Sequence, residues 1–137
     1  MVNNFRNEAG FSMLELIIYI SIVGIILAVA VPKYNNAIIM ANTARIQADL
    51  QTLDGAIMMY YTETGQYPDA VGDLGDYVKN VTELHPPKGK YMLKDGTMGE
   101  ISDGEYTIDG EENEALCDGH RLADFGRQDK SSHGSGL

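Results

Sequence analysis

The chain has 137 residues, a formal net charge of −10 and a single cysteine, Cys117. That length accommodates one small domain and a membrane segment. The negative charge argues against direct binding to nucleic acid, whose phosphates would repel it, and one cysteine excludes a disulfide within the chain.

Residues 1–10 form a short polar segment. An apolar run follows from Phe11 to Val31, and Glu15 is its one charged residue. A helix over residues 11–31 would be roughly 30 Å long, which is enough to cross the hydrocarbon core of a bilayer. A carboxylate in such a span costs about 2.5–3.5 kcal/mol on insertion scales, so Glu15 needs a partner or a role. We expect one membrane span with its N-terminus in the cytoplasm, which Arg6 favours.

The apolar run also has an alternative interpretation as a cleaved signal peptide. Ala28-Val29-Ala30 is a small-x-small site of the kind that signal peptidase cuts, and cleavage after Ala30 would release a secreted acidic module. Against this, the apolar run exceeds the 7–15 residues of a signal core, and it contains Glu15. The uncleaved span is therefore favoured.

The residues at the start of this run, Gly10-Phe11-Ser12-Met13-Leu14-Glu15-Leu16, resemble the processing site of type IV pilins and type II secretion pseudopilins. The resemblance implies that residues 1–10 are a prepilin leader, and that a prepilin peptidase cuts after Gly10 and methylates the new terminus, Phe11. It also implies that Glu15 serves filament assembly, where it would attract the Phe11 amine of a neighbouring subunit. Leaders of this family carry Lys or Arg beside the cleaved glycine, whereas this chain has Glu8-Ala9.

Three further residues of the run bear on helix packing and flexibility. Gly24 and Ala28 are four residues apart, a spacing that lets helices approach closely. Gly24 and Pro32 weaken a helix locally, and both fall where the family often has a glycine and a proline. The resemblance implies that the stretch between them can lose helicity in a filament.

After Pro32 the pattern becomes amphipathic, with polar residues between regularly spaced apolar ones. The spacing predicts that the helix continues through residues 32–63, to about Thr62, with Gly65 as its stop. Residues 58–61, Met-Met-Tyr-Tyr, are expected to pack in a core rather than to bind a cofactor. The predicted buried stripe consists of Ile39, Ile46, Leu50, Leu53, Ile57 and Tyr60.

Gly65-Gln66-Tyr67-Pro68 predicts a turn, and it resembles the entrance to the head of pseudopilins. Val71, Leu74, Tyr77 and Val78 then recur at helical spacing and predict a short helix, with Asp69 as its N-cap. Beyond residues 85–87 come short runs separated by Asp-Gly pairs, the dipeptide that favours hairpin turns. We expect an antiparallel meander of strands over residues 90–94, 97–102 and 105–108, with a fourth over 114–117 as an alternative.

The acidic loops could form a cation site. Calcium prefers several oxygen ligands from a flexible loop, and major pseudopilins bind calcium in a C-terminal loop. The candidates here are Asp103, Asp109, Glu111 and Glu112, although a solvated acidic loop is the first interpretation. Cys117-Asp118-Gly119-His120 lacks the second half of a zinc site and the other parts of a catalytic site. We therefore expect no cofactor.

These patterns predict an α+β, type IV pilin-like fold, in which a long N-terminal helix packs on an antiparallel sheet of three or four strands. Residues 64–118 form the head, and residues 119–137 are expected to be a flexible polar tail. The predicted function is structural rather than enzymatic. The subunit would sit in the inner membrane and then polymerise with itself and homologous subunits, by way of a prepilin peptidase and a membrane assembly platform. A pilus, a secretion pseudopilus and a DNA-uptake apparatus all remain open.

Overall fold

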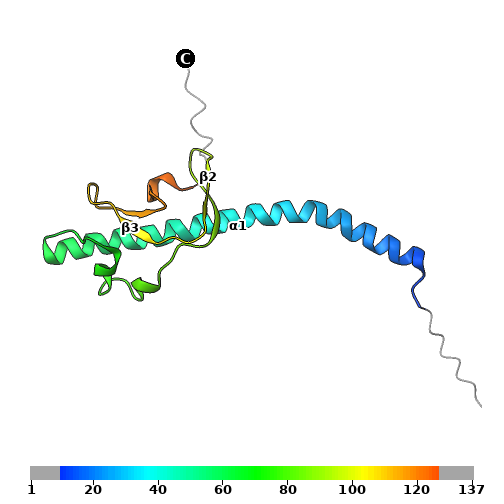
Figure 1. Ribbon diagram of the computed structural model, residues 1–137, viewed down its shortest axis with the longest axis horizontal. Coiled ribbons are helices and arrows are strands. Elements are labelled where there is room, and N and C mark those ends of the chain that lie inside the picture. The colour runs from blue at the N-terminus through cyan, green and yellow to red at the C-terminus, as the bar shows by residue number, and fades with distance from the viewer. Residues whose placement is uncertain (1–9, 127–137) are drawn as a thin grey trace, which may run out of the picture. The chain divides into compact units, whose positions relative to one another are not determined.

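The computed structural model describes residues 10–126. The chain divides into two compact units, Met1–Asn36 and Ala37–Leu137. Helix α1 (Met13–Thr64) begins in the first unit and supplies the central element of the second (Figure 1). The prediction of one long N-terminal helix that continues past Pro32 is therefore confirmed.

Helix α1 ends at a glycine. Gly65 adopts a φ of 76°, and its N–H donates to the carbonyl oxygen of Tyr61 at 2.8 Å. That left-handed conformation is readily accessible only to glycine. The predicted stop at Gly65 is confirmed, and the helix reaches Thr64 rather than Thr62.

The buried stripe of α1 contains four of the predicted residues at its centre. Ile46, Leu50, Leu53 and Ile57 are at most 2% exposed. Tyr60 packs against the edge of this core, and Ile39 is also half-buried. The successive spacings of four, three and four residues keep the stripe on one side of a helix with 3.6 residues per turn.

The prediction that Met58, Met59 and Tyr61 pack in the core is wrong. Both methionines are 59% exposed, because a turn of 100° per residue carries them away from the side that holds Ile57. Tyr61 lies at the end of the helix, where its ring stacks on that of Tyr67 with centroids 4.3 Å apart.

The segment after α1 forms two 3₁₀ turns, η1 (Val71–Leu74) and η2 (Val81–Glu83), instead of the predicted helix over residues 71–78. The predicted N-cap, Asp69, is also wrong. The carboxylate of Asp73 reaches back and accepts the N–H groups of Asp69 and Ala70 at 3.2 and 3.0 Å. The N-cap position belongs to Ala70, and Asp73 satisfies the two N–H groups that precede the turn.

The strands form two sheets rather than the single predicted meander. Strands β2 (Met98–Ile101) and β3 (Tyr106–Ile108) do not pair, and neither Asp103 nor Gly104 between them adopts the positive φ that a two-residue hairpin turn requires. The strands themselves lie where they were expected, including the fourth. The first sheet pairs β1 (Gly89–Met92) with β2 (Met98–Ile101), and the second has the order β3 (Tyr106–Ile108), β4 (Ala115–Cys117), β5 (His120–Arg121).

Two Asp-Gly pairs do close hairpins. At Asp95-Gly96 only the glycine has positive φ, 91°, and the N–H of Thr97 donates to Asp95 Oδ1 at 2.8 Å. At Asp118-Gly119 both residues have positive φ, 51° and 77°, which is the two-residue I′ geometry between β4 and β5. The sequence analysis used the first pair and missed the second.

Polar side chains on α1 attach both sheets to the helix. The hydroxyl oxygen of Thr43 accepts the N–H of Met92 at 2.9 Å. For the second sheet, Asp49 accepts the Tyr106 hydroxyl at 2.7 Å, and Asp54 accepts the N–H of Ala115 at 2.7 Å. The helix thus contributes acceptors to strand ends as well as an apolar stripe.

The predicted flexible tail over residues 119–137 is wrong for its first part. Residues 120–126 contain β5, the 3₁₀ turn η3 (Leu122–Asp124) and Phe125, which is fully buried. The ring of Phe125 lies 5.4 Å from that of Tyr91, and Gln47 Nε2 donates to its carbonyl oxygen at 3.1 Å. Residues 127–137, and residues 1–9 of the expected leader, lie outside the described part.

Candidate functional site

The predicted processing site lies immediately before α1. Gly10 and Phe11 are exposed and precede the first helical residue, Met13. Ser12 caps the helix, because its Oγ accepts the N–H of Glu15 at 3.2 Å. The sequence Ser-x-x-Glu is a known signal for a helix start, and the sequence analysis did not use it.

Glu15 lies one turn into the helix, at the predicted position for an assembly carboxylate. Its Oε1 accepts the hydroxyl of Tyr19 at 3.2 Å. The ring of Tyr19 also contacts that of Phe11 edge-on, with centroids 6.0 Å apart and planes at 81°. The sequence analysis missed Tyr19, although the four-residue spacing from Glu15 places the two side chains on one face of a helix.

The remainder of the span presents an apolar surface. The large apolar side chains from Leu14 to Val31 are about half exposed or more. This part of α1 has a window with mean hydropathy of 2.7, none of it buried. Within residues 10–126, α1 is the one helix long and apolar enough to cross a membrane. An apolar surface of this extent is normally covered by lipid or by other helices.

The residues predicted to give packing and flexibility all lie inside a continuous helix. Gly24 has no heavy atom within 4 Å of a Cβ placed on it, so this face is open to a partner. Ala28 lies one turn further along the same face, and Pro32 is inside α1. The alternative cleavage site, residues 28–30, is helical as well.

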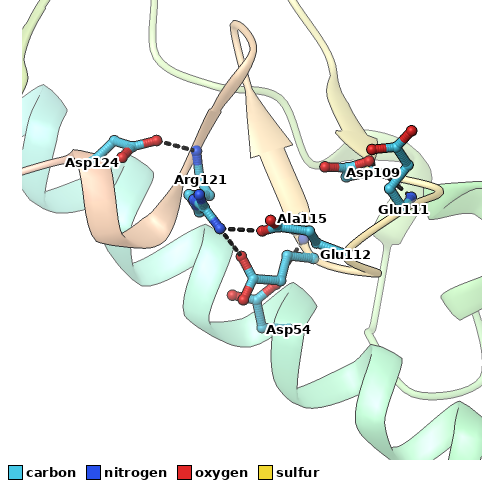
Figure 2. Close-up of polar contacts among 8 residues, drawn as sticks. Asp54, Asp109, Glu111, Glu112, Ala115, Arg121 and Asp124 are labelled. Atoms are coloured by element: carbon cyan, nitrogen blue, oxygen red, sulfur yellow. Dashed lines mark hydrogen bonds and ion pairs between the residues drawn. The ribbon is translucent and has the colours of Figure 1, made fainter.

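The calcium candidates do not converge on one site. Asp103 pairs with Lys88 at 3.5 Å. The Asp109 carboxylate accepts the N–H of Glu111 at 3.0 Å, within its own loop. Glu112 instead pairs with the guanidinium of Arg121, as Figure 2 shows.

Arg121 is the centre of this acidic region. Its guanidinium contacts Glu112 and lies 3.8 Å from Glu114. The backbone N–H of Arg121 donates to the Asp124 carboxylate at 3.1 Å (Figure 2). These residues and Asp109 line a cavity of about 200 Å³. The cationic group already compensates the nearby carboxylates. Among residues 10–126, no group of three His, Cys, Asp or Glu side chains is arranged to hold a metal ion.

The single cysteine is a core residue. Cys117 is fully buried, and this burial, with a smaller contribution from Asp118 and Asp49, raises the pKa of its thiol to about 12. The thiolate is the nucleophilic form, so Cys117 is protonated and unreactive at neutral pH. This environment gives no support to a catalytic Cys117-His120 pair.

These features define a class of protein. A long N-terminal helix with an exposed apolar start, joined to a head of two small antiparallel sheets, is a pilin-like α+β fold. Residues 5–31 match the prokaryotic N-terminal methylation motif, which includes Gly10, Phe11 and Glu15.

Similar proteins include both pseudopilins and pilins. The chain is 29% identical to the type II secretion system core protein G of Dickeya chrysanthemi, over 66% of this chain and 58% of that protein. It is 29% identical to a type IV major pilin protein of Neisseria gonorrhoeae, over 74% of this chain and 51% of that protein. It is 27% identical to the core protein G of Aeromonas hydrophila, over 77% of this chain and 87% of that protein.

The matches to the Dickeya and Neisseria proteins thus span little more than half of those relatives. No solved structure matches the chain significantly. The motif and the relatives confirm the predicted resemblance to type IV pilins and type II secretion pseudopilins.

Proposed function

We propose that this protein is a structural subunit that is cleaved after Gly10, methylated on the amine of Phe11 and polymerised through α1. The filament is a type IV pilus or a type II secretion-type pseudopilus, in accordance with the two kinds of relatives. One observation carries the proposal: the N-terminal methylation motif, residues 5–31, continues into a helix whose apolar residues are exposed. Assembly, rather than catalysis, is the function that such a surface supports.

The exposed apolar surface explains why polymerisation would be favourable. Before assembly, lipid covers residues 14–31, and after assembly the same surface packs against neighbouring helices. Helix association of this kind gains close packing rather than a new hydrophobic effect. The open face at Gly24 and Ala28 permits that close approach.

Glu15 supplies the selectivity of the assembly step. Cleavage after Gly10 creates a positively charged amine at Phe11, and the amine of an incoming subunit is attracted to the Glu15 carboxylate of its neighbour. In a medium of low dielectric constant this attraction is strong, and pairing removes the cost of burying either charge alone. An incoming subunit is thereby held in one register along the filament.

The proposed pathway begins in the inner membrane. The short N-terminus lies in the cytoplasm, where a prepilin peptidase reaches Gly10, and residues 37–126 lie on the other side. A membrane assembly platform then transfers the subunit from lipid to a filament of identical and homologous subunits. The net charge of −10 disfavours direct contact between the head and nucleic acid.

The mass of the N-terminal peptide of the mature protein tests the processing step. We expect a peptide that begins at methylated Phe11. A peptide that begins at Val31 would show that signal peptidase releases a secreted module, and the filament proposal would then be wrong.

The variant Glu15→Ala tests the assembly step. We expect this chain to be cleaved and methylated normally but to enter filaments poorly in the presence of wild-type subunits. The matched control is Gln51→Ala, which changes an exposed polar residue of the same helix outside the span and is expected to assemble normally. Normal incorporation of Glu15→Ala would remove the role given to Glu15.

A further inference from the structure

We propose that Tyr19 is a positioning residue that holds the Glu15 carboxylate ready for the incoming amine. This inference rests on the proposed assembly role of Glu15. Two contacts carry it: the Tyr19 hydroxyl donates to Glu15 Oε1 at 3.2 Å, and the Tyr19 ring contacts the ring of Phe11. The three side chains therefore form one cluster at the start of α1.

The helix itself brings these residues together. Glu15 and Tyr19 are four residues apart in α1, and a step of four rotates a helical position by only about 40°. Phe11 lies just before the helix, and its ring reaches that of Tyr19 from there. Side chains on a helix also lean toward its N-terminus, so the long Tyr19 side chain extends over the turn that carries Glu15. The cluster thus forms within one chain, before any partner arrives.

The hydrocarbon environment makes this bond important. Water cannot satisfy polar groups within the bilayer core, so each must find a partner in the protein. The short side chain of Ser21 reaches the carbonyl oxygen of Ile17 at 2.6 Å. The Tyr19 hydroxyl stands at the far end of a ring and bonds to the Glu15 side chain instead. The hydroxyl supplies a donor to the carboxylate, and the carboxylate supplies an acceptor to the hydroxyl.

The hydrogen bond from Tyr19 orients the Glu15 carboxylate but uses only one of its two oxygens. Tyr19 uses Oε1, and no residue within the described range 10–126 donates to Oε2. A carboxylate has about four acceptor positions, so the second oxygen can receive the amine of another subunit. Because the carboxylate is already held in one orientation, less side-chain freedom is lost when that amine binds.

The conservative variant Tyr19→Phe tests the hydroxyl while keeping the ring contact with Phe11. We expect cleavage after Gly10 to remain normal and incorporation into filaments, in competition with wild-type subunits, to fall about ten-fold or more, the ratio that a hydrogen bond to a charged group typically supplies. The matched control is Tyr34→Phe, because Tyr34 is on the same helix beyond Pro32 and is 68% exposed. It should incorporate like the wild type.

A second measurement reads the contact directly and needs no filament. In the detergent-solubilised full chain, the ¹³C resonance of Tyr19 Cζ should shift when Glu15→Ala removes the acceptor, and that of Tyr34 Cζ should not. An unchanged Tyr19 resonance would overturn the proposal. So would normal incorporation of Tyr19→Phe.

The two proposals can fail separately. A wild-type chain that starts at Val31 or does not polymerise overturns the proposed function. Wild-type polymerisation together with normal incorporation of Tyr19→Phe overturns only the role of Tyr19. In a Glu15→Ala background the additional change Tyr19→Phe should cause no further loss, because the carboxylate that it orients is gone. A further loss there would show that Tyr19 acts independently of Glu15.

Discussion

The hydroxyl of Tyr91 donates to Oδ2 of Asp118 at 2.6 Å, and this bond links the two sheets of the head. Tyr91 belongs to β1, and Asp118 lies in the turn between β4 and β5. The side chain of Tyr91 is only 1% exposed. Burial, followed by the bond to Asp118, raises the pKa of Tyr91, so the hydroxyl keeps its proton and remains a donor throughout the ordinary pH range.

Removing this hydroxyl should destabilise the head. We expect Tyr91→Phe to lower the free energy of unfolding by about 1.5–3 kcal/mol, the usual value for a hydrogen bond to a charged group. Urea unfolding of the detergent-solubilised chain, followed by near-ultraviolet circular dichroism, measures the loss. Tyr77→Phe is the control, because its hydroxyl bonds to Glu63 at an exposed position and surface changes are usually within about 0.5 kcal/mol. Equal losses would contradict the prediction.

Gly99 should not tolerate a side chain. It lies opposite Tyr91 in the β1–β2 ladder, and a Cβ built on it would overlap Cζ and Oη of that tyrosine. We expect Gly99→Ala to displace the ring and to cost about 1–3 kcal/mol, as overpacking of a core does. Gly110→Ala is the matched control, because nothing lies within 4 Å of its Cβ position. A thermal melt that places both variants near the wild type would contradict this prediction.

Asp54 should make the stability of the head depend on pH. Burial raises the pKa of Asp54 above its ordinary value of 3.8, and the bond from the N–H of Ala115 offsets only part of this. The folded chain therefore holds this proton more tightly than the unfolded chain. The resulting contribution to stability is fully present below pH 3.8 and is lost as the pH rises through the folded pKa.

The variant Asp54→Asn resembles the protonated acid and keeps an acceptor for Ala115. We expect it to melt at a higher temperature than the wild type near neutral pH, and the difference to disappear below pH 3.8. Asp54→Ala is the contrasting variant, because it leaves the buried N–H of Ala115 without its acceptor and should cost about 1–3 kcal/mol. An Asn variant that is less stable than the wild type at neutral pH would show that the charged hydrogen bond dominates.

Calcium should have little effect on the head. Arg121 already compensates Glu112 and Glu114, so we expect neither millimolar Ca²⁺ nor a chelator to change the melting temperature. Arg121→Ala should cost less than about 1 kcal/mol, since the pair is exposed, and the loss should shrink at high salt. A lower melting temperature in the chelator would instead indicate a bound cation.

The helix and the strand positions could be predicted because their signals are repeated. The apolar residues from Ile46 to Ile57 recur at helical spacing. A regular period of that kind indicates a helix whatever the helix packs against. The motif at Gly10 and Phe11 was equally readable, since it depends on a short contiguous sequence. Which strands pair with which could not be predicted from the sequence in the same way.

Sheet pairing depends on backbone angles that one dipeptide does not fix. Asp103-Gly104 and Asp118-Gly119 have the same sequence, yet only the second adopts positive φ at both residues. Phe125 was missed for a related reason: its only apolar neighbours in sequence are Leu122 and Ala123, and so short an apolar stretch shows no period. Its contact with Tyr91 joins residues far apart in the chain.

The position of Phe125 also sets the order of events during synthesis. The head core contains Tyr91 and Phe125 in contact, so it cannot close until residue 125 has left the ribosome. Until then the apolar stripe of α1 is not fully covered, even though the first strands have already been made. Contacts between distant residues are slow to form because loop closure must precede them. A partly synthesised chain therefore exposes its apolar stripe to proteolysis, and this exposure ends only when Phe125 has been added and packs against Tyr91.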